Sequence, residues 1–234
     1  MQSPERVVAL LLSIHGASPR ALGEDFCGTA AVSRAWVRIV PGGSAVAVDL
    51  DAGVLERAAG DARIELVHGD ACNATDPARH RADVIFVGNF SIGEIGERPG
   101  LVRYLSRARE RLDAHGIFVC DTYAGPSSLR VGAVERSHWI EGGARILYVW
   151  EQREFDPCTS RAVNAMHFRV ERDGEIVQSI EDAFVYRWRL WSVPELRDAM
   201  AEAGFAATEV VPMQPSADAA EGFIPCVVGR TDPR

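Results

Sequence analysis

The stretch from Leu22 to Ala31 combines acidic, glycine and small residues in a way that suits ligand binding. Its start reads as a short strand, and Cys27-Gly28-Thr29 reads as the tight turn before a helix. A second strand follows and ends on Asp49, 21 residues after Gly28. A glycine at such a turn lets a ligand approach the backbone, and an acid after the second strand accepts hydrogen bonds from ribose hydroxyls. The pattern therefore predicts a nucleotide-binding βαβ unit.

The turn lacks the three-glycine fingerprint of dinucleotide-binding proteins, because Phe26 and Ala30 fill two of the three glycine positions. A pyrophosphate lies at the N-terminus of the helix and needs bare backbone there. A ligand without phosphates is less demanding, so the turn favours such a ligand.

This turn resembles the first motif of the class I S-adenosylmethionine (SAM) dependent methyltransferases, an acid followed by three alternating glycines, often with Cys-Gly-Thr in its middle. Here the motif reads Glu24-Asp25-Phe26-Cys27-Gly28-Thr29-Ala30. The resemblance covers nearly the whole chain outside residues 124–190, and it implies SAM as the cofactor and S-adenosylhomocysteine as its product. The cofactor-binding residues that it implies are Glu24, Asp25, Phe26, Cys27, Gly28, Asp49, Leu50, Asp70, Ala71, Asn89 and Phe90.

Two further apolar segments end in residues that suit the same ligand. Residues 64–67 form a predicted strand, and Asp70-Ala71 after it match the acid and small residue that read the adenine in these methyltransferases. Residues 82–88 form a nearly continuous apolar run, as expected of a strand that is covered on both faces. Ligands bind at the carboxyl ends of strands in open α/β sheets, so Asn89-Phe90 are expected to line the methionine end and the transfer site.

The chain reads as five successive βα units, then a segment of period two, then a return to α/β form. From Glu135 to Leu190 apolar and polar residues alternate, and Asp173-Gly174 predicts a β-hairpin. We therefore expect an α/β fold with a doubly wound, Rossmann-like, seven-stranded and mostly parallel sheet, and an antiparallel β insertion after the fifth strand. The resemblance implies that the last strand is antiparallel beside the fifth.

The expected domain boundaries follow from this change of period. Residues 1–124 and 191–234 are predicted to form the SAM-binding methyltransferase domain. Residues 125–190 are predicted to form the antiparallel insertion, and because they begin just after the fifth strand they can cover the active site at its carboxyl end.

An acceptor amine or phenol must lose a proton when it is methylated, so a general base near the transfer site is expected. Tyr123, His138 and His167 are the candidates, and Tyr123 and His138 are assigned as catalytic. Trp150, from the aromatic-rich insertion, joins these two as a predicted substrate-binding residue. The arginine-rich face of the helix at about 100–112 is expected to be solvated.

Composition excludes several classes of function. The 234-residue chain has a net charge of −8 and contains no lysine. It can therefore have no Walker lysine, no Schiff-base lysine and no Tyr-x-x-x-Lys pair of a short-chain dehydrogenase. An acidic protein without lysine is poorly suited to long polynucleotides, whose binding depends on neutralising phosphates. We expect a small-molecule acceptor and no nucleic acid.

The cysteines and the apolar runs indicate where the protein works. The five cysteines are widely spaced with no Cys-x-x-Cys pair, and no apolar run approaches the ~20 residues of a membrane span. We expect no metal site, no membrane partner and a reducing, cytoplasmic location. The aromatic faces of the insertion are too large to be left wet on a stable monomer, so one is expected to cover a pocket or to form a homodimer.

Two alternatives stay open beside a SAM-dependent methyltransferase that acts on a small-molecule N or O acceptor. A nicotinamide-dependent Rossmann oxidoreductase would also place Asp49 on a ribose, although the missing glycines and the absent lysine argue against it. A catalytically inactive SAM-binding protein is the second alternative, because Phe26 replaces the first glycine of the motif.

Overall fold

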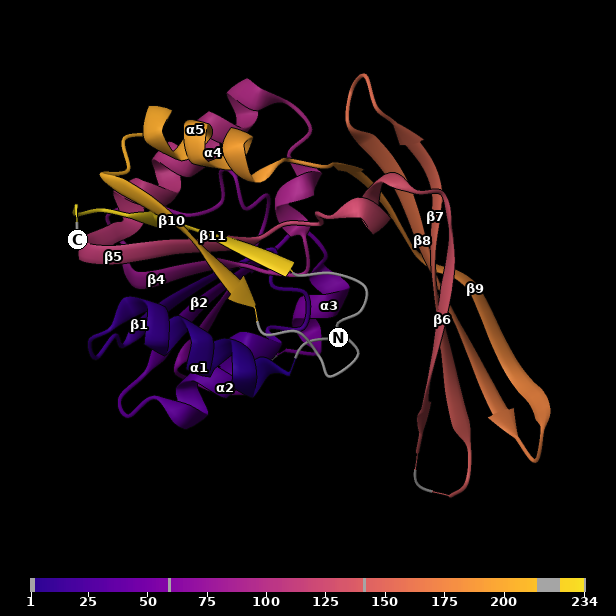
Figure 1. Ribbon diagram of the computed structural model, residues 1–234. Coiled ribbons are helices and arrows are strands. Elements are labelled where there is room, and N and C mark those ends of the chain that lie inside the picture. Colours follow the sequence, from indigo (N-terminus) through magenta and orange to yellow (C-terminus); the bar gives the residue numbers. More distant parts are fainter. Residues whose placement is uncertain (1–2, 59, 141, 214–223, 234) are drawn as a thin grey trace.

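The computed structural model describes residues 3–58, 60–140, 142–213 and 224–233, which contain two β-sheets (Figure 1). The larger sheet has seven strands in the order β10-β11-β5-β4-β1-β2-β3, and the smaller has four in the order β6-β7-β8-β9. The strands of the larger sheet are β1 (Ala21–Asp25), β2 (Ser44–Asp49), β3 (Ile64–His68), β4 (Ala82–Val87), β5 (Leu112–Asp121), β10 (Ala207–Met213) and β11 (Ile224–Arg230). The helices are α1 (Pro4–His15), α2 (Ala31–Ile39), α3 (Ala52–Glu56), α4 (Arg98–Arg111) and α5 (Val193–Glu202), with short 3-10 helices η1 (Ser91–Glu94) and η2 (Pro126–Leu129).

The larger sheet is mostly parallel. The pairs β1–β2, β1–β4, β2–β3 and β4–β5 are parallel, whereas β11 runs antiparallel to both β5 and β10. This arrangement confirms the predicted seven-stranded sheet with its last strand antiparallel beside the fifth.

Helices cover both faces of the larger sheet, with α1 and α2 on one side and α4 and α5 on the other (Figure 1). Leu11 and Trp36 belong to the apolar cluster on the first side, and Leu105 and Met200 belong to the cluster on the second. Every residue of β4 except Asp83 is buried. The continuous apolar run in the sequence is therefore explained by a central strand that is covered twice.

The smaller sheet is an antiparallel meander of β6 (Gly132–Trp139), β7 (Arg145–Asp156), β8 (Arg161–Arg172) and β9 (Glu175–Arg189). Asp173 and Gly174 join β8 to β9 with φ angles of 52° and 82°, as an Asp-Gly hairpin turn requires. Figure 1 shows this sheet beside the carboxyl ends of the central parallel strands, with its hairpins extending past the larger domain.

Some boundaries differ from the sequence expectations. Helix α2 begins at Ala31 rather than at Thr29, because Ala30 is left-handed with a φ of 52° and still belongs to the turn. The antiparallel segment begins at Gly132, earlier than Glu135, because β6 is an exposed edge strand without clear alternation. The polar loop predicted at residues 216–222 lies outside the described residues.

Candidate cofactor and acceptor site

The turn after β1 has the backbone conformation expected of the three-glycine motif, although only one of the three positions is a glycine. Phe26, Gly28 and Ala30 have φ angles of 58°, 53° and 52°, the left-handed region that glycine adopts without cost. For a residue with a side chain this conformation costs roughly 1–2 kcal/mol, so the chain retains the turn against its own local preference. A Cβ atom added to Gly28 would meet nothing within 4 Å, so the backbone there faces open space.

Glu24 points into the protein beneath this turn. Its carboxylate accepts hydrogen bonds from the backbone N–H of Ser33 at 2.7 Å, from the Ser33 hydroxyl at 2.5 Å and from the N–H of Val32 at 3.4 Å. Burial raises the pKa of Glu24 to about 7, although these hydrogen bonds oppose the shift. Glu24 thus fixes the first turn of α2 rather than lying on the open side of the loop.

Asp25 is also turned inward, toward α4. Arg111 Nη1 donates to both Asp25 oxygens at 2.7 and 3.0 Å, and the Tyr104 hydroxyl donates to Asp25 Oδ2 at 2.8 Å. Asp25 is fully buried and Arg111 is 1% exposed, so this ion pair is withdrawn from water. The expectation that the arginine face of this helix is solvated is wrong for Arg111, which continues the buried row formed by Leu101 and Ala108.

Asp49 lies at the carboxyl end of β2, directly against the turn. Its Oδ2 accepts from the Gly28 N–H at 2.7 Å and its Oδ1 accepts from the Asp51 N–H at 2.9 Å. An ionised carboxylate has about four acceptor positions, so both oxygens keep capacity for further donors. The next residue, Leu50, is 71% exposed and presents an apolar surface beside this carboxylate.

Asp70 and Ala71 follow β3 at the same edge of the sheet. Asp70 is exposed, and its side chain accepts from the Cys72 N–H and the Asn73 side-chain amide, each at 2.9 Å. Ala71 is buried, which brings the chain close to the sheet next to Asp70. The Gly69 N–H donates to the Asp49 carbonyl at 2.9 Å and holds the ends of β2 and β3 together.

A buried carboxylate shapes the loop after β4. Asn89 and Phe90 both adopt left-handed φ angles, 55° and 63°, and their N–H groups donate to the Asp121 carboxylate at 3.1 and 2.7 Å. Asp121 ends β5 and is fully buried. Asn89 is exposed and Phe90 is half-buried, so the loop presents both side chains at the carboxyl edge. Cys27, predicted at the same site, is buried behind the turn.

Five rings from four parts of the chain meet beside this loop, and we call them the aromatic cluster: Phe90, Tyr123, Trp150, Tyr186 and Trp188. Phe90 and Tyr123 lie 5.3 Å apart between centroids, Tyr123 and Trp150 lie 5.8 Å apart, and Tyr186 stacks on Trp188 at 4.6 Å. Burial raises the pKa of the Tyr123 phenol. The structure therefore brings together Phe90, Tyr123 and Trp150, which the sequence assigned to one site.

The structure does not bring His138 to this cluster. His138 is exposed on β6 and pairs with Ile146, whereas Trp150 pairs with Val134. Four residues separate Val134 from His138, a distance along the strand of roughly 13 Å. His138 shares a sheet face with Trp150 but lies toward the distal hairpin.

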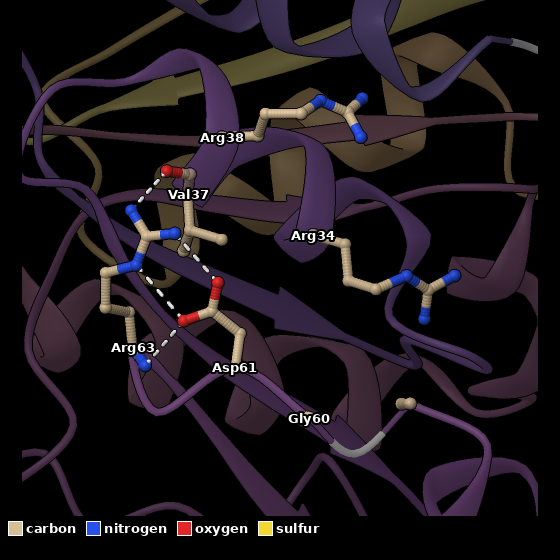
Figure 2. Close-up of a pocket in the computed structure, with 7 residues that line it drawn as sticks. Arg34, Val37, Arg38, Gly60, Asp61 and Arg63 are labelled. Atoms are coloured by element: carbon tan, nitrogen blue, oxygen red, sulfur yellow. Dashed lines mark hydrogen bonds and ion pairs between the residues drawn. The ribbon is translucent and has the colours of Figure 1, made fainter.

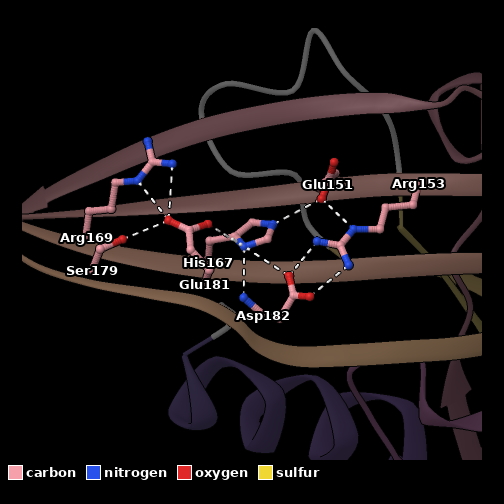
Figure 3. A network of polar contacts seen from close by, with 7 residues as sticks. All are labelled: Glu151, Arg153, His167, Arg169, Ser179, Glu181 and Asp182. Carbon is pink, nitrogen blue, oxygen red and sulfur yellow. Dashed lines mark hydrogen bonds and ion pairs between the residues drawn. The ribbon is translucent and has the colours of Figure 1, made fainter.

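His167, the third candidate base, is engaged on the opposite face of the smaller sheet (Figure 3). The Asp182 N–H donates to His167 Nδ1 at 3.0 Å, and His167 Nε2 lies 3.2 Å from Glu151 Oε2. Glu181 approaches Nδ1 at 3.0 Å, and Arg153 binds both Glu151 and Asp182. The imidazole is thus part of a polar network that joins β7, β8 and β9.

One indole N–H attaches the smaller sheet to the loop after β4, and a second, just beyond the end of β9, binds within the core that covers the larger sheet. Trp188 Nε1 donates to Glu94 Oε1 at 2.7 Å, and Trp191 Nε1 donates to the Ile95 carbonyl at 2.9 Å. A Cβ on Gly93 would lie 3.0 Å from the Trp188 side chain, so a glycine is needed where η1 meets β9. Sequence reasoning did not assign Glu94 to the site. Its place in the loop after β4, two residues beyond Ile92, was the only sign in the sequence that it lies at the carboxyl edge of the sheet.

A separate pocket of about 550 Å³ lies away from this edge of the sheet (Figure 2). It is lined by the second half of α2 and by the loop that leads into β3, which is the amino end of that strand. Its arginines have partners, since Arg63 pairs with Asp61 and Arg38 pairs with Glu5. We therefore do not assign it to the cofactor or the acceptor.

Within the described ranges, no group of three or more His, Cys, Asp or Glu side chains could hold a metal ion. None of the helices in those ranges is long and apolar enough to cross a membrane.

No protein-family model matches the sequence, and no curated protein matches it at a significant level. Solved structures do match. The SAM-bound amino pentose methyltransferase CalS10 from Micromonospora echinaspora aligns with a TM-score of 0.77 and 15% identity, over 99% of this chain and 92% of that one. DesVI from Streptomyces venezuelae aligns with a TM-score of 0.76 and 18% identity, over 97% and 89%.

The sugar N-methyltransferase KedS8 from Streptoalloteichus sp ATCC 53650 aligns with a TM-score of 0.70 and 17% identity, over 97% of this chain and 86% of that one. At these identities the similarity establishes the fold. The chain has the fold of SAM-dependent methyltransferases, as the resemblance in the first motif implied, and the match also covers the antiparallel insertion, which the alternating pattern predicted.

Proposed function

We propose that this protein is a SAM-dependent methyltransferase. The observation that carries the proposal is the turn at Gly28, whose open backbone faces outward while the Asp49 carboxylate lies against it at 2.7 Å. This arrangement stands at the carboxyl edge of a sheet whose fold is shared with SAM-bound CalS10. A bare backbone beside an acid is what an adenosine ligand without phosphates requires.

The residues at this edge fit the parts of the cofactor. Asp49 would accept hydrogen bonds from the ribose hydroxyls, exposed Leu50 would cover one face of the adenine, and Asp70 would accept from its exocyclic amine. SAM, when bound, supplies a methyl group that its sulfonium makes electrophilic. Glu24 and Asp25 would support the turn from behind, because both are already held by buried partners.

We propose a small-molecule acceptor bound through nitrogen at the aromatic cluster. CalS10 is described as an amino pentose methyltransferase, and KedS8 is described as a sugar N-methyltransferase. Half-buried rings around Tyr123 would exclude water and hold the acceptor in line, and such positioning is worth roughly 7–11 kcal/mol. Tyr123 is the residue that we assign to orienting the acceptor nitrogen through its hydroxyl, because burial raises the pKa of the phenol and keeps it protonated. His138 stays a candidate catalytic and substrate-binding residue only for an acceptor long enough to extend from the aromatic cluster along β6.

Residues 125–190 would act as the cover of this site, as a unit distinct from residues 1–124 and 191–234. Trp150 is the test residue, because it contacts Tyr123 and has no part in the cofactor edge. Trp150→Ala should impair methyl transfer and leave SAM binding unchanged. Equal loss of SAM binding would show that the insertion serves the cofactor rather than the acceptor.

We also propose that two copies associate through the smaller sheet in a cytoplasmic setting. Trp139, Ile140, Ile176, Val177 and Ile180 are all at least 40% exposed near its distal hairpins. All five cysteines are free thiols, which fits a reducing compartment. Light scattering on the wild type and on Trp139→Glu tests the association, and a monomeric wild type would refute it.

Calorimetry with four ligands tests the cofactor. We expect micromolar binding of SAM and S-adenosylhomocysteine and no comparable binding of NAD or NADP. Tighter binding of a nicotinamide cofactor would replace this proposal with an oxidoreductase. Binding of SAM without methyl transfer to any of a panel of amines, alcohols and phenols would favour the inactive SAM-binding protein.

A further inference from the structure

Glu94 is a carboxylate that the proposed function does not use, although it lies beside the aromatic cluster. It ends η1, the short helix that follows Phe90 at the carboxyl end of β4. Its Oε1 accepts from the Trp188 indole at 2.7 Å, which fixes the orientation of the side chain. Among the residues that the structure describes, Oε2 has no hydrogen-bond partner.

The Glu94 carboxylate can be reached by a ligand, and its charge is partly desolvated. The residue is exposed to solvent, yet the protein atoms around the carboxylate desolvate it enough to raise its pKa, against the effect of the Trp188 hydrogen bond. A positively charged ligand at this position would replace lost hydration and meet little competition from protein donors.

Trp150 and Tyr186 are partly exposed near Glu94, whereas Trp188 is buried against them. Tyr186 stacks on Trp188 with an interplanar angle of 28°, and Phe184 stacks on Tyr186 at 8° with 51% of its surface exposed. Trp150 lies 6.1 Å from Tyr186 and 5.8 Å from Trp188. A cation within about 6 Å of such a ring face is attracted by its quadrupole.

Two arginines near the Glu94 end of the cluster are occupied elsewhere, whereas Arg136 lies opposite Tyr148, farther along the smaller sheet. Arg161 pairs with Glu97 at 2.6 Å, and Arg189 lies over the Trp191 ring at 3.9 Å and pairs with Glu195. The charge on the Glu94 side of the cluster is therefore negative, which complements an ammonium group.

We infer that Glu94 and the exposed parts of Trp150 and Tyr186 form a subsite for the acceptor amine. The amine would enter as an ammonium with Glu94 as its counter-ion, and it would pass one proton to this carboxylate before its nitrogen lone pair attacks the methyl carbon. The inference rests on the proposed function for the identity of this ligand as the acceptor, and it restricts the acceptor to a primary or secondary amine on a small, partly apolar body. A neutral hydroxyl could donate a hydrogen bond to the carboxylate but would leave its charge without a counter-ion.

The variants can separate charge from structure. Glu94→Gln keeps an oxygen that accepts from Trp188 and removes the charge alone. Glu94→Asp keeps the charge with a shorter side chain. Glu97→Gln removes a charge three residues away that pairs with Arg161 outside the cluster, and it serves as the matched control.

The experiment compares choline with its neutral isostere 3,3-dimethyl-1-butanol, using tryptophan fluorescence of the full chain with and without S-adenosylhomocysteine. We expect the wild type and Glu97→Gln to prefer choline by roughly tenfold or more. Glu94→Gln should lose this preference and bind the isostere as before, while Glu94→Asp should keep part of it.

Three results would overturn the inference: no preference for choline in the wild type, an unchanged preference in Glu94→Gln, or an equal loss in Glu94→Asp. Binding of S-adenosylhomocysteine is measured on the same samples. If the choline preference depends on Glu94 while neither SAM nor S-adenosylhomocysteine binds, the ammonium subsite stands and the proposed methyltransferase function fails.

Discussion

The larger and the smaller sheet each contain a charged network, and the two networks differ in burial. Beneath the turn in the larger sheet, Arg111 and Asp25 are both withdrawn from water, and Tyr104 donates a second hydrogen bond to Asp25. On the smaller sheet, Arg153 and Asp182 pair at the surface around His167. The larger sheet is packed by helices on both faces, whereas the smaller sheet meets the rest of the molecule at one end.

This difference suits the two sheets to different roles in the proposed enzyme: the larger sheet binds the cofactor, and the smaller sheet contributes to binding the acceptor. A turn that binds a constant cofactor benefits from a rigid support, because its geometry need not change between acceptors. A sheet attached at one end opens at a lower free-energy cost than a core strand does. The acceptor side is therefore carried by the part of the molecule that can adjust.

The largest expected effect tests the buried network. Arg111→Met leaves Asp25 buried without its cation, and removal of one partner from such a pair destabilises by about 3–5 kcal/mol. Urea denaturation should report this loss. Arg153→Met is the matched change in the smaller sheet, and it should alter stability little, because exposed ion pairs contribute little. Equal losses in the two variants would remove the distinction between the networks.

The sequence predicted the part of the site that depends on neighbours along the chain. Gly28 and Asp49 were found from a spacing of 21 residues and a strand–turn–helix pattern. The pairing of Arg111 with Asp25 spans 86 residues and depends on how α4 packs, so spacing alone could not show it. The Trp188–Glu94 contact spans 94 residues and joins the two sheets.

The backbone of the turn was also beyond sequence reasoning. Phe26 and Ala30 have no intrinsic preference for left-handed angles, so their presence in place of two glycines gave no indication that the turn keeps the path of a glycine motif. The packing of Phe26 on Tyr104, 6.0 Å between ring centroids, and the complete burial of Ala30 hold this path instead.

The next effect is a pH dependence that should have opposite signs in the two sheets. Glu24 has a folded pKa of about 7, raised by burial above its unfolded value of 4.5, so the folded state binds more protons between these values. Its contribution to stability is complete below pH 4.5 and is lost as pH rises to about 7, a change of at most about 3 kcal/mol.

Unfolding curves between pH 5 and 8 should therefore show falling stability for the wild type and a flatter profile for Glu24→Gln. In the smaller sheet, the Arg153 hydrogen bonds lower the pKa values of Glu151 and Asp182, so that network loses stability as pH falls. A Glu24→Gln profile that follows the wild type would assign the slope to other groups.

Asp49→Ala should weaken SAM binding by at least about tenfold, because charged hydrogen bonds of this kind contribute roughly 1.5–3 kcal/mol. The structure also indicates a cost without ligand. The Gly28 and Asp51 N–H groups both donate to Asp49, so the ligand-free variant should lose about 1 kcal/mol of stability. Calorimetry and thermal unfolding measure the two effects, and unchanged affinity would place the ribose elsewhere.

The smallest expected effect tests the attachment between the sheets. Trp188→Phe keeps a ring in the aromatic cluster and removes the indole N–H that binds Glu94, a loss of about 1 kcal/mol. Because this bond joins the sheets at one end, protection from hydrogen exchange should fall in β8 and β9 and stay constant in β1 and β4.

Trp191→Phe is the control, because Trp191 is 1% exposed in the core that covers the larger sheet and its indole N–H donates to the Ile95 carbonyl. Its loss should lower protection in β4 and α5 instead. If both variants lower protection equally throughout the chain, the two sheets unfold as one unit, and the adjustable acceptor side that we infer would have no physical basis.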